Sequence, residues 1–389
     1  MRLLSRRLLA LVGMSASTLV AVPSWASPYF QTNLVSDLPG FAQLTDASLK
    51  NPWGMSFSAG SPFWVSDQAT NSSTLYRVVN GVVTKVSLTV GIPTTAGGPQ
   101  GPTGQVNNNT SSFVLTSSTG VMAPANFIFA NLNGTISAWN GGAGTTSVVK
   151  ATTPGAVYTG LAIATSGSGP RLYAANGASG KIDVFDGSFA PVTTLPSTAF
   201  VNTDPRLAGL APFNVQNIGG SIYVTYAAPG RAAQIIAGEG SGAVAVFDTN
   251  GALIRTVVAG SKLASPWGIT LAPAGFGGFS GDLLIGNFSF VASEINAFDP
   301  VTGAFLGTIA DQSGATLINS GLWGLAFGNG VSGDARTLYF TAGINEERNG
   351  LFGSIAAIPE PGTLALFAVG LVAFATRIPR RRRSGRLST

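Results

Sequence analysis

Polar side chains that could bind a metal recur at one place in a repeated pattern. Each follows a short apolar run of the sequence: Asp67, Asn131, Asn176, Tyr226 and Asn287. Carboxylate and amide oxygens are the ligands that Ca²⁺ prefers, so a ring of such groups would form a calcium site. Asn and Asp also stand at such places because turns favour them, and both interpretations stay open.

Several kinds of catalysis are excluded because none of the 389 residues is a histidine or a cysteine. No Ser-His-Asp or Cys-His site, His general base, thiolate metal site, c-type haem or iron–sulfur cluster can form. A few aspartates resemble the paired carboxylates of glycoside hydrolases but stand beside turn signals: Asp183, Asp186, Asp248 and Asp299. We expect them to form turns, and the sequence identifies no catalytic residue.

The polar side chains that follow the apolar runs belong to an internal repeat of the sequence. Copies of a short motif share a marker in their fourth position: Gly54, Gly104, Gly160, Asn214, Gly268 and Gly324. Successive markers are 50 to 56 residues apart. Behind each marker come short apolar runs separated by turn signals such as Asn-Gly and Asp-Gly, which favour β-hairpins.

Four short strands in each unit of this length are typical of a β-propeller blade. We therefore predict an all-β protein, a six-bladed β-propeller over residues 27–357. The second strand of each blade should end at the same rim of a central channel. A pair of β-sandwiches is the alternative, but it would not explain six equal units.

The sixth unit is incomplete, which predicts how the ring closes. Its third strand covers about Ser354–Ile358, and Pro359 prevents the chain from continuing in a sheet. The segment Tyr29–Leu34, from the other end of the chain, is the natural partner. We expect these segments to pair because pairing would cover exposed sheet edges.

Two further groups of residues invite a functional interpretation. Trp53, Trp267 and Trp323 stand beside the repeat markers and could stack on sugars, although packing between blades is the interpretation we favour. The densest charge cluster of the body is the segment 346–349, which reads Glu-Glu-Arg-Asn. We expect a solvated hairpin tip there, with a contact site as the alternative.

The N-terminal residues 1–26 predict a secretory signal. Three arginines precede an apolar stretch, and Ser24 and Ala26 fit a cleavage site, so we expect cleavage after Ala26. The two ends of the chain hold nine arginines and one glutamate, a net +8, against +5 for the whole chain. The body is therefore at −3, and we expect no nucleic-acid partner.

The C-terminal residues 358–389 form a second targeting signal. Pro359, Glu360 and Pro361 precede an apolar stretch of 14 residues at 363–376, and arginines follow: Arg380, Arg381, Arg382 and Arg383. This pattern resembles the PEP-CTERM sorting signal, which is also labelled an ice-binding C-terminal motif. The resemblance implies a Gram-negative host that makes extracellular polysaccharide. It also implies a short transmembrane helix and processing by an exosortase of the inner membrane.

The body also resembles an uncharacterised bacterial family, many of whose members carry this tail. The resemblance rests on Phe63–Asp67, Asn214–Gly220, Gly281–Phe288 and Leu351–Ile355. It implies a secreted propeller without an established activity. Family members tend to have a longer acidic insertion where this chain has residues 227–240, which contain Arg231 and only Glu239 as an acid.

Together these features predict an exported, non-catalytic propeller, anchored briefly by its C-terminal helix and then located at the cell surface or outside the cell. We expect it to bind extracellular polysaccharide or a surface protein, or to serve as structural material of the matrix. The alternative is a metal-dependent hydrolase of the lactonase type. Its Ca²⁺ would lie at a channel-rim site made of Asp67, Asn131, Asn176 and Asn287. No other cofactor is expected.

Overall fold

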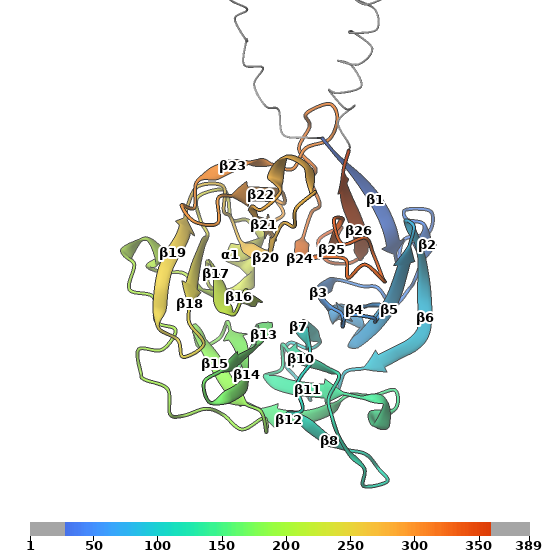
Figure 1. Cartoon of the computed structure of the whole chain (residues 1–389), viewed down its shortest axis with the longest axis vertical. Helices are drawn as coiled ribbons and strands as arrows, with labels where there is room; N and C mark the ends of the chain where they lie inside the picture. Colours follow the sequence, from blue (N-terminus) through green and yellow to red (C-terminus); the bar gives the residue numbers. More distant parts are fainter. Residues whose placement is uncertain (1–27, 359–389) are drawn as a thin grey trace, which may run out of the picture.

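The computed structural model describes residues 28–358. The predicted secretory signal and the predicted sorting segment from Pro359 onward, including its hydrophobic helix, lie outside the described residues. Within them, sheets are arranged like blades around a central axis, in the order of the chain (Figure 1). The first strand of each blade contacts the first strands of its neighbours at the axis.

The first three blades contain the following strands, from the axis outward. Blade 1 has β3 (Pro52–Ser56), β4 (Phe63–Asp67), β5 (Ser72–Val79) and β6 (Val82–Gly91). Blade 2 has β7 (Pro102–Asn107), β10 (Phe127–Asn131), β11 (Thr135–Trp139) and β12 (Val148–Thr152), with the hairpin β8 (Val114–Thr116) and β9 (Met122–Pro124) inserted. Blade 3 has β13 (Tyr158–Ser166), β14 (Gly169–Asn176) and β15 (Lys181–Asp186).

The other three blades follow the same order from the axis outward. Blade 4 has β16 (Ala211–Ile218), β17 (Ser221–Ala227), β18 (Ala243–Phe247) and β19 (Leu253–Ala259). Blade 5 has β20 (Pro266–Leu271), β21 (Leu283–Asn287), β22 (Ile295–Phe298) and β23 (Phe305–Thr308). Blade 6 has β24 (Leu322–Phe327), β25 (Leu338–Ala342), β26 (Leu351–Ala357), β1 (Tyr29–Ser36) and the short β2 (Leu44–Thr45).

The second strands explain the continuous apolar runs of the sequence. Every residue of β4, β10, β21 and β25 is buried, because neighbouring blades cover both faces of these strands. The outermost strands β12 and β23 are largely exposed or half-buried. The core is therefore a ring of interfaces between blades, and the predicted six-bladed propeller is confirmed.

The ring closes through the N-terminal strand, as predicted. β1 pairs antiparallel with β26, from Tyr29 opposite Ala357 to Ser36 opposite Leu351. In Figure 1 the two ends of the described chain lie side by side in this blade. β26 begins three residues before the predicted Ser354, because Leu351 already pairs with Ala342 of β25.

Blade 3 differs from the prediction of four strands in every unit. After β15 the chain forms a turn, and the Val192 N–H donates to the Val184 carbonyl at 2.8 Å. No further strand joins this sheet. Pro191 and Pro196 lack the backbone N–H that a strand needs, which explains why the chain leaves the blade here.

The repeat markers lie on the innermost strands, where glycine permits close approach of neighbouring blades. A Cβ atom added at Gly104 would lie 2.2 Å from the Leu161 backbone nitrogen, and one at Gly160 would lie 2.1 Å from Asn214 Oδ1. The channel between these strands is reduced to a cavity of about 40 Å³. The marker glycines are therefore present because the innermost strands pack closely at the axis.

Helices play a small part in the described residues. The one α-helix there is α1 (Arg231–Ile235), in the loop between β17 and β18. No helix in residues 28–358 is long and apolar enough to cross a membrane.

Candidate functional site

The four residues of the predicted channel-rim site end the second strands of four blades. Asp67 pairs across the sheet with Pro52, Asn131 with Pro102, Asn176 with Tyr158 and Asn287 with Pro266. Each partner is the first residue of the innermost strand of the same blade. These side chains therefore belong to one end of the channel.

Each rim residue is hydrogen-bonded within its own blade, to a side chain of the third strand or its preceding loop. Thr74 Oγ1 donates to Asp67 Oδ2 at 2.8 Å. The amide groups of the three asparagines donate to Thr135 Oγ1 at 2.9 Å, to Asp183 Oδ2 at 2.9 Å and to Glu294 Oε1 at 3.2 Å. In residues 28–358 no three acidic side chains gather closely enough to share a metal ion. A metal at these positions stays a prediction.

Asp67 is the most unusual member of this set. It is fully buried, and its Oδ1 has no hydrogen-bond partner among the described residues. Burial raises the pKa of Asp67 well above its ordinary value of 3.8, while the bond from Thr74 opposes this effect. The buried carboxyl is therefore more stable in its protonated form.

Asp67 should make stability fall as the pH rises. Because its pKa is raised in the folded state, the folded protein keeps a proton that the unfolded chain releases from about pH 3.8 upward. Stability is lost through the interval up to the raised pKa. We expect Asp67→Asn to remove this loss, so its melting temperature relative to wild type should rise from pH 4 to pH 8. Asp334→Asn, at an exposed position, should show no such trend.

The tryptophans at the markers pack together at the same end of the channel, as the sequence indicated. The rings of Trp53 and Trp323 stack at 3.5 Å between centroids, and Trp267 meets both edge-on. Phe288 stacks on Trp323 at 4.1 Å, and Phe213 completes the cluster. We call these five residues the aromatic cluster. All are buried, so the exposed sugar platform that we weighed does not form.

Arg231 of α1 lies over the aromatic cluster. Its guanidinium carbon is 3.7 Å from the centre of the Phe288 ring and 5.0 Å from that of Trp323. Its Nε donates to Glu347 Oε2 at 3.1 Å, and its Nη2 forms an ion pair with Glu347 Oε1. Burial lowers the pKa of Arg231, and Glu347 opposes this shift. The guanidinium is thus held between aromatic rings and a carboxylate.

The segment around Glu347 corrects the predicted solvated hairpin tip. Glu346 and Arg348 are exposed as expected, but the side chain of Glu347 is only 20% exposed and also accepts from Asn51 Nδ2 at 2.9 Å. Asn345, Glu346 and Glu347 have φ values of 53°, 57° and 66°. Three successive non-glycine residues in the left-handed region are strained, and such strain gathers at functional sites.

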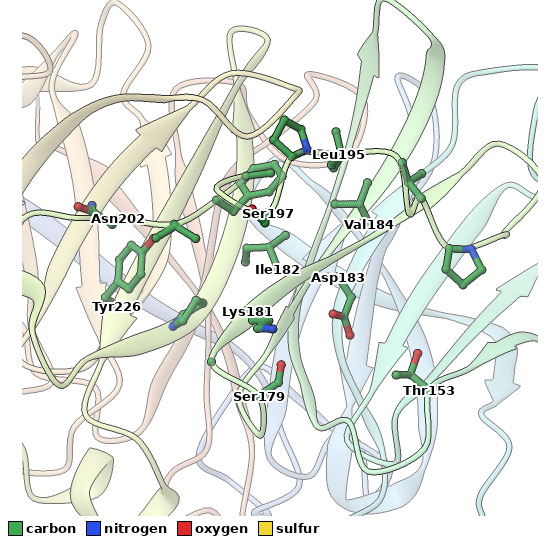
Figure 2. Close-up of a pocket in the computed structure, with 18 of the residues that line it drawn as sticks. Thr153, Ser179, Lys181, Ile182, Asp183, Val184, Leu195, Ser197, Asn202 and Tyr226 are labelled. Atoms are coloured by element: carbon green, nitrogen blue, oxygen red, sulfur yellow. The ribbon is translucent and has the colours of Figure 1, made fainter.

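A groove of about 590 Å³ lies between blades 3 and 4 (Figure 2). Its volume is in the range of about 300–1,000 Å³ that is usual for ligand sites. It lies beside β15, where blade 3 lacks a fourth strand, so residues Lys181 to Ile182 have no strand on their outer side. The facing wall comes from the segment that replaces this strand and from blade 4: Leu195, Ser197, Phe200, Asn202, Leu207 and Tyr226.

The edge of β15 presents backbone groups to this groove. The Asp186 N–H donates outward to the Ala190 carbonyl at 2.8 Å, and the Val184 carbonyl accepts from Val192. Outward-facing groups alternate along an antiparallel strand with a period of two. Ile182 therefore directs its N–H and carbonyl toward the groove.

Asp183, which also lines the groove, corrects the predicted role of one aspartate. It lies inside β15, and its Oδ2 accepts from the Tyr158 hydroxyl and the Asn176 amide, both at 2.9 Å. The other three aspartates form turns as predicted, by accepting backbone N–H bonds: Asp186, Asp248 and Asp299. The sequence signal that could have revealed the groove is the presence of Pro191 and Pro196 after the third apolar run of the third unit, because prolines there disfavour a fourth strand.

The fold and the tail together define a class of protein, an exported β-propeller with a sorting motif. Residues 357–382 match the PEP-CTERM protein-sorting motif. Of the predicted sorting residues, Pro359 to Pro361 and Arg380 to Arg382 lie in the matched segment, and Arg383 follows it directly. Exosortases recognise this motif, which marks proteins for export and sorting to the surface or beyond.

Relatives of the body come from a virus. "Uncharacterized protein R648" of Acanthamoeba polyphaga mimivirus is 32% identical over 342 residues, which cover 86% of this chain and 81% of the relative. "Uncharacterized protein L690" of the same virus is 29% identical over 349 residues and 86% of each chain. The chain belongs to the family of these mimivirus proteins. The sequence motifs had indicated a bacterial family, and these viral relatives are likewise uncharacterised.

Solved structures with a similar fold are more distant. A streptogramin B lyase is 12% identical with a TM-score of 0.49, over 86% of this chain and 98% of the other. A glucose dehydrogenase is 11% identical with a TM-score of 0.49, over 85% of this chain and all of the other.

Proposed function

We propose that this protein is a non-catalytic binding protein of the cell surface, which holds an extended polypeptide segment in the groove between blades 3 and 4. The observation that carries this proposal is the edge of β15 at Lys181 and Ile182, which no strand of blade 3 covers. An unpaired strand edge is a template for a further strand, and peptides bind to many domains by adding one. The ligand would continue the pairing that Ala190 and Val192 begin on the outer side of β15, and would bond to Ile182.

The walls of the groove support a peptide more than a sugar. The aromatic side chains among its lining residues, Phe185, Phe200 and Tyr226, are all buried. A sugar would therefore find no exposed ring to stack on. Half-buried apolar residues such as Ile182 and Leu195 could instead receive alternate side chains of a strand. Lys181 and Asp183 place one charge of each sign at the end where β15 begins.

The ends of the chain support the proposed location. We propose that residues 1–26 direct export and are removed after Ala26. The apolar stretch at 363–376 then anchors the chain briefly in the inner membrane of a Gram-negative cell, with the arginines on the cytoplasmic side. Processing by an exosortase near Pro359 to Pro361 releases the propeller to the surface or the polysaccharide matrix.

Selection of peptides from a displayed random library on the purified propeller tests the groove. We expect wild type to enrich peptides with alternating apolar residues, which protect the Ile182 amide from hydrogen exchange. Ser197→Trp fills the groove at an exposed position and should lower affinity at least about tenfold, a loss of about 1.4 kcal/mol. Thr193→Trp lies in the same segment but does not line the groove, so it should bind like wild type.

Equal binding by the two tryptophan variants would contradict the proposed site. Cosedimentation with extracellular polysaccharide, weakened by Ser197→Trp alone, would make the ligand a sugar chain and the peptide proposal wrong. The alternative, a metal-dependent hydrolase, predicts that Ca²⁺ raises the melting temperature and that Asp67→Asn removes this rise. Under our proposal Ca²⁺ leaves the melting temperature unchanged.

A further inference from the structure

We propose that the aromatic cluster at the channel mouth is a binding site for a guanidinium group, which Arg231 occupies from within the chain. A partner that presents an arginine side chain would take its place. This inference does not depend on the ligand of the groove between blades 3 and 4. It rests on three features of the mouth: the surroundings of Arg231, an unpaired donor and the way α1 is attached.

The surroundings of Arg231 suit a planar cation, although its Nη1 has no hydrogen-bond partner among the described residues. The guanidinium lies over the Phe288 ring, its Nε donates to Glu347 Oε2, and its Nη2 forms an ion pair with Glu347 Oε1. Asn51 holds Glu347 in place through its Nδ2, and accepts the Trp323 Nε1–H with its Oδ1 at 3.0 Å. A planar fork beside a carboxylate and an aromatic face is the geometry that selects a guanidinium over an ammonium.

One donor of the aromatic cluster has no partner. Trp267 Nε1 donates to the Thr159 carbonyl at 2.8 Å, and Trp323 Nε1 donates to Asn51. Trp53 is 4% exposed, yet its Nε1 has no hydrogen-bond partner among the described residues. A guanidinium has no acceptor to offer this N–H. An arginine residue in a peptide would place its guanidinium beside Glu347, and its backbone carbonyl could accept the Trp53 Nε1–H.

The segment that carries Arg231 is attached to the blades mainly through its C-terminal part. α1 has five residues and lies in the loop 228–242 between β17 and β18, outside every sheet. The end of α1 and the residues after it are tied to blade 5: the Phe290 N–H donates to the Ile235 carbonyl at 2.9 Å, and Ser289 Oγ donates to the Ala237 carbonyl at 2.6 Å. The first turn, residues 230–233, makes no backbone hydrogen bond to another element of the described residues. The Arg231 side chain is 36% exposed along its stem, although its Nη1 and Nη2 are inaccessible. Displacement of the Arg231 side chain with this first turn would uncover the aromatic cluster and leave the sheets intact.

Arg231→Ala with methylguanidinium as the probe tests the site in the purified propeller. We expect a saturable change in tryptophan fluorescence and a saturable rise in melting temperature in the variant, with neither in wild type. Tetramethylammonium at equal ionic strength cannot donate to Glu347, so it should bind at least about tenfold more weakly. Arg255→Ala removes a guanidinium that donates to the Pro300 and Val301 carbonyls, away from the aromatic cluster, and should not respond.

Each possible result either supports the guanidinium site or overturns it. A variant that does not respond, or a response equal to that of wild type, overturns it. Arg231→Met keeps the apolar stem and serves as a second variant. If either variant folds only with methylguanidinium present, the proposal is supported, and if neither folds with or without the probe, it is wrong. A response to tetramethylammonium as strong as that to methylguanidinium would replace the guanidinium site by a general cation site.

Discussion

Tyr29→Ala should lower the free energy of unfolding by about 3–5 kcal/mol, the usual cost of removing a large buried aromatic side chain. Tyr29 begins the strand that closes the ring and is 1% exposed. Its ring packs on Phe276 and Phe279, with centroids at 4.9 and 5.9 Å, and its hydroxyl donates to the Phe276 carbonyl at 2.9 Å. The substitution removes these contacts together and leaves a cavity between blades 5 and 6.

Phe30→Ala is the matched control on the same strand. Phe30 is 61% exposed on the other face, so we expect a change within about 0.5 kcal/mol in a denaturant titration. Deleting residues 28–36 should abolish the cooperative transition altogether, because the edge of β26 and the cluster around Tyr29 would both be exposed. Equal effects of the two alanine substitutions would show that closure does not depend on this packing.

The number of blades could be predicted because the signals that set it are local. Turn residues end each run, and the axis admits almost only glycine at the marker position, so every unit carries its own copy of both signals. The closing strand could be predicted because the sixth unit lacks the apolar run for an outermost strand. The fourth strand of blade 3 was wrongly predicted because the repeat implied four strands in every unit, whereas Pro191 and Pro196 lack the N–H groups that this strand would need.

The side-chain partners of the rim residues could not be predicted from the local sequence. Their place at one end of the channel followed from the repeat. Whether they share a ligand depends on side-chain partners, and each has one on the neighbouring strand of its own blade or in the loop before it, as Asp67 has Thr74. The ion pair of Arg231 with Glu347 spans 116 residues. No pattern near either residue indicates that pairing, because it depends on two loops that meet over the aromatic cluster.

Gly104→Ala is expected to cost at least about 3 kcal/mol, the upper end of the range for overpacking. The added Cβ would lie 2.2 Å from the Leu161 nitrogen and 2.7 Å from the Gly160 carbonyl carbon. Both are backbone atoms of blade 3, so no side chain can turn away to make room. Blade 3 could move outward only by loosening its contacts with blade 4, because the ring is closed.

Gly167→Ala is the control for this test, since it changes the same residue type in the turn between β13 and β14. Nothing lies within 4 Å of its added Cβ, and its backbone is not left-handed. We expect no loss there, and a gain of up to about 1 kcal/mol because alanine restricts the unfolded chain. Denaturant titrations of both variants measure the difference. If Gly104→Ala proved as stable as Gly167→Ala, the inner strands would not pack as tightly as the marker glycines indicate, and the explanation of the repeat would be wrong.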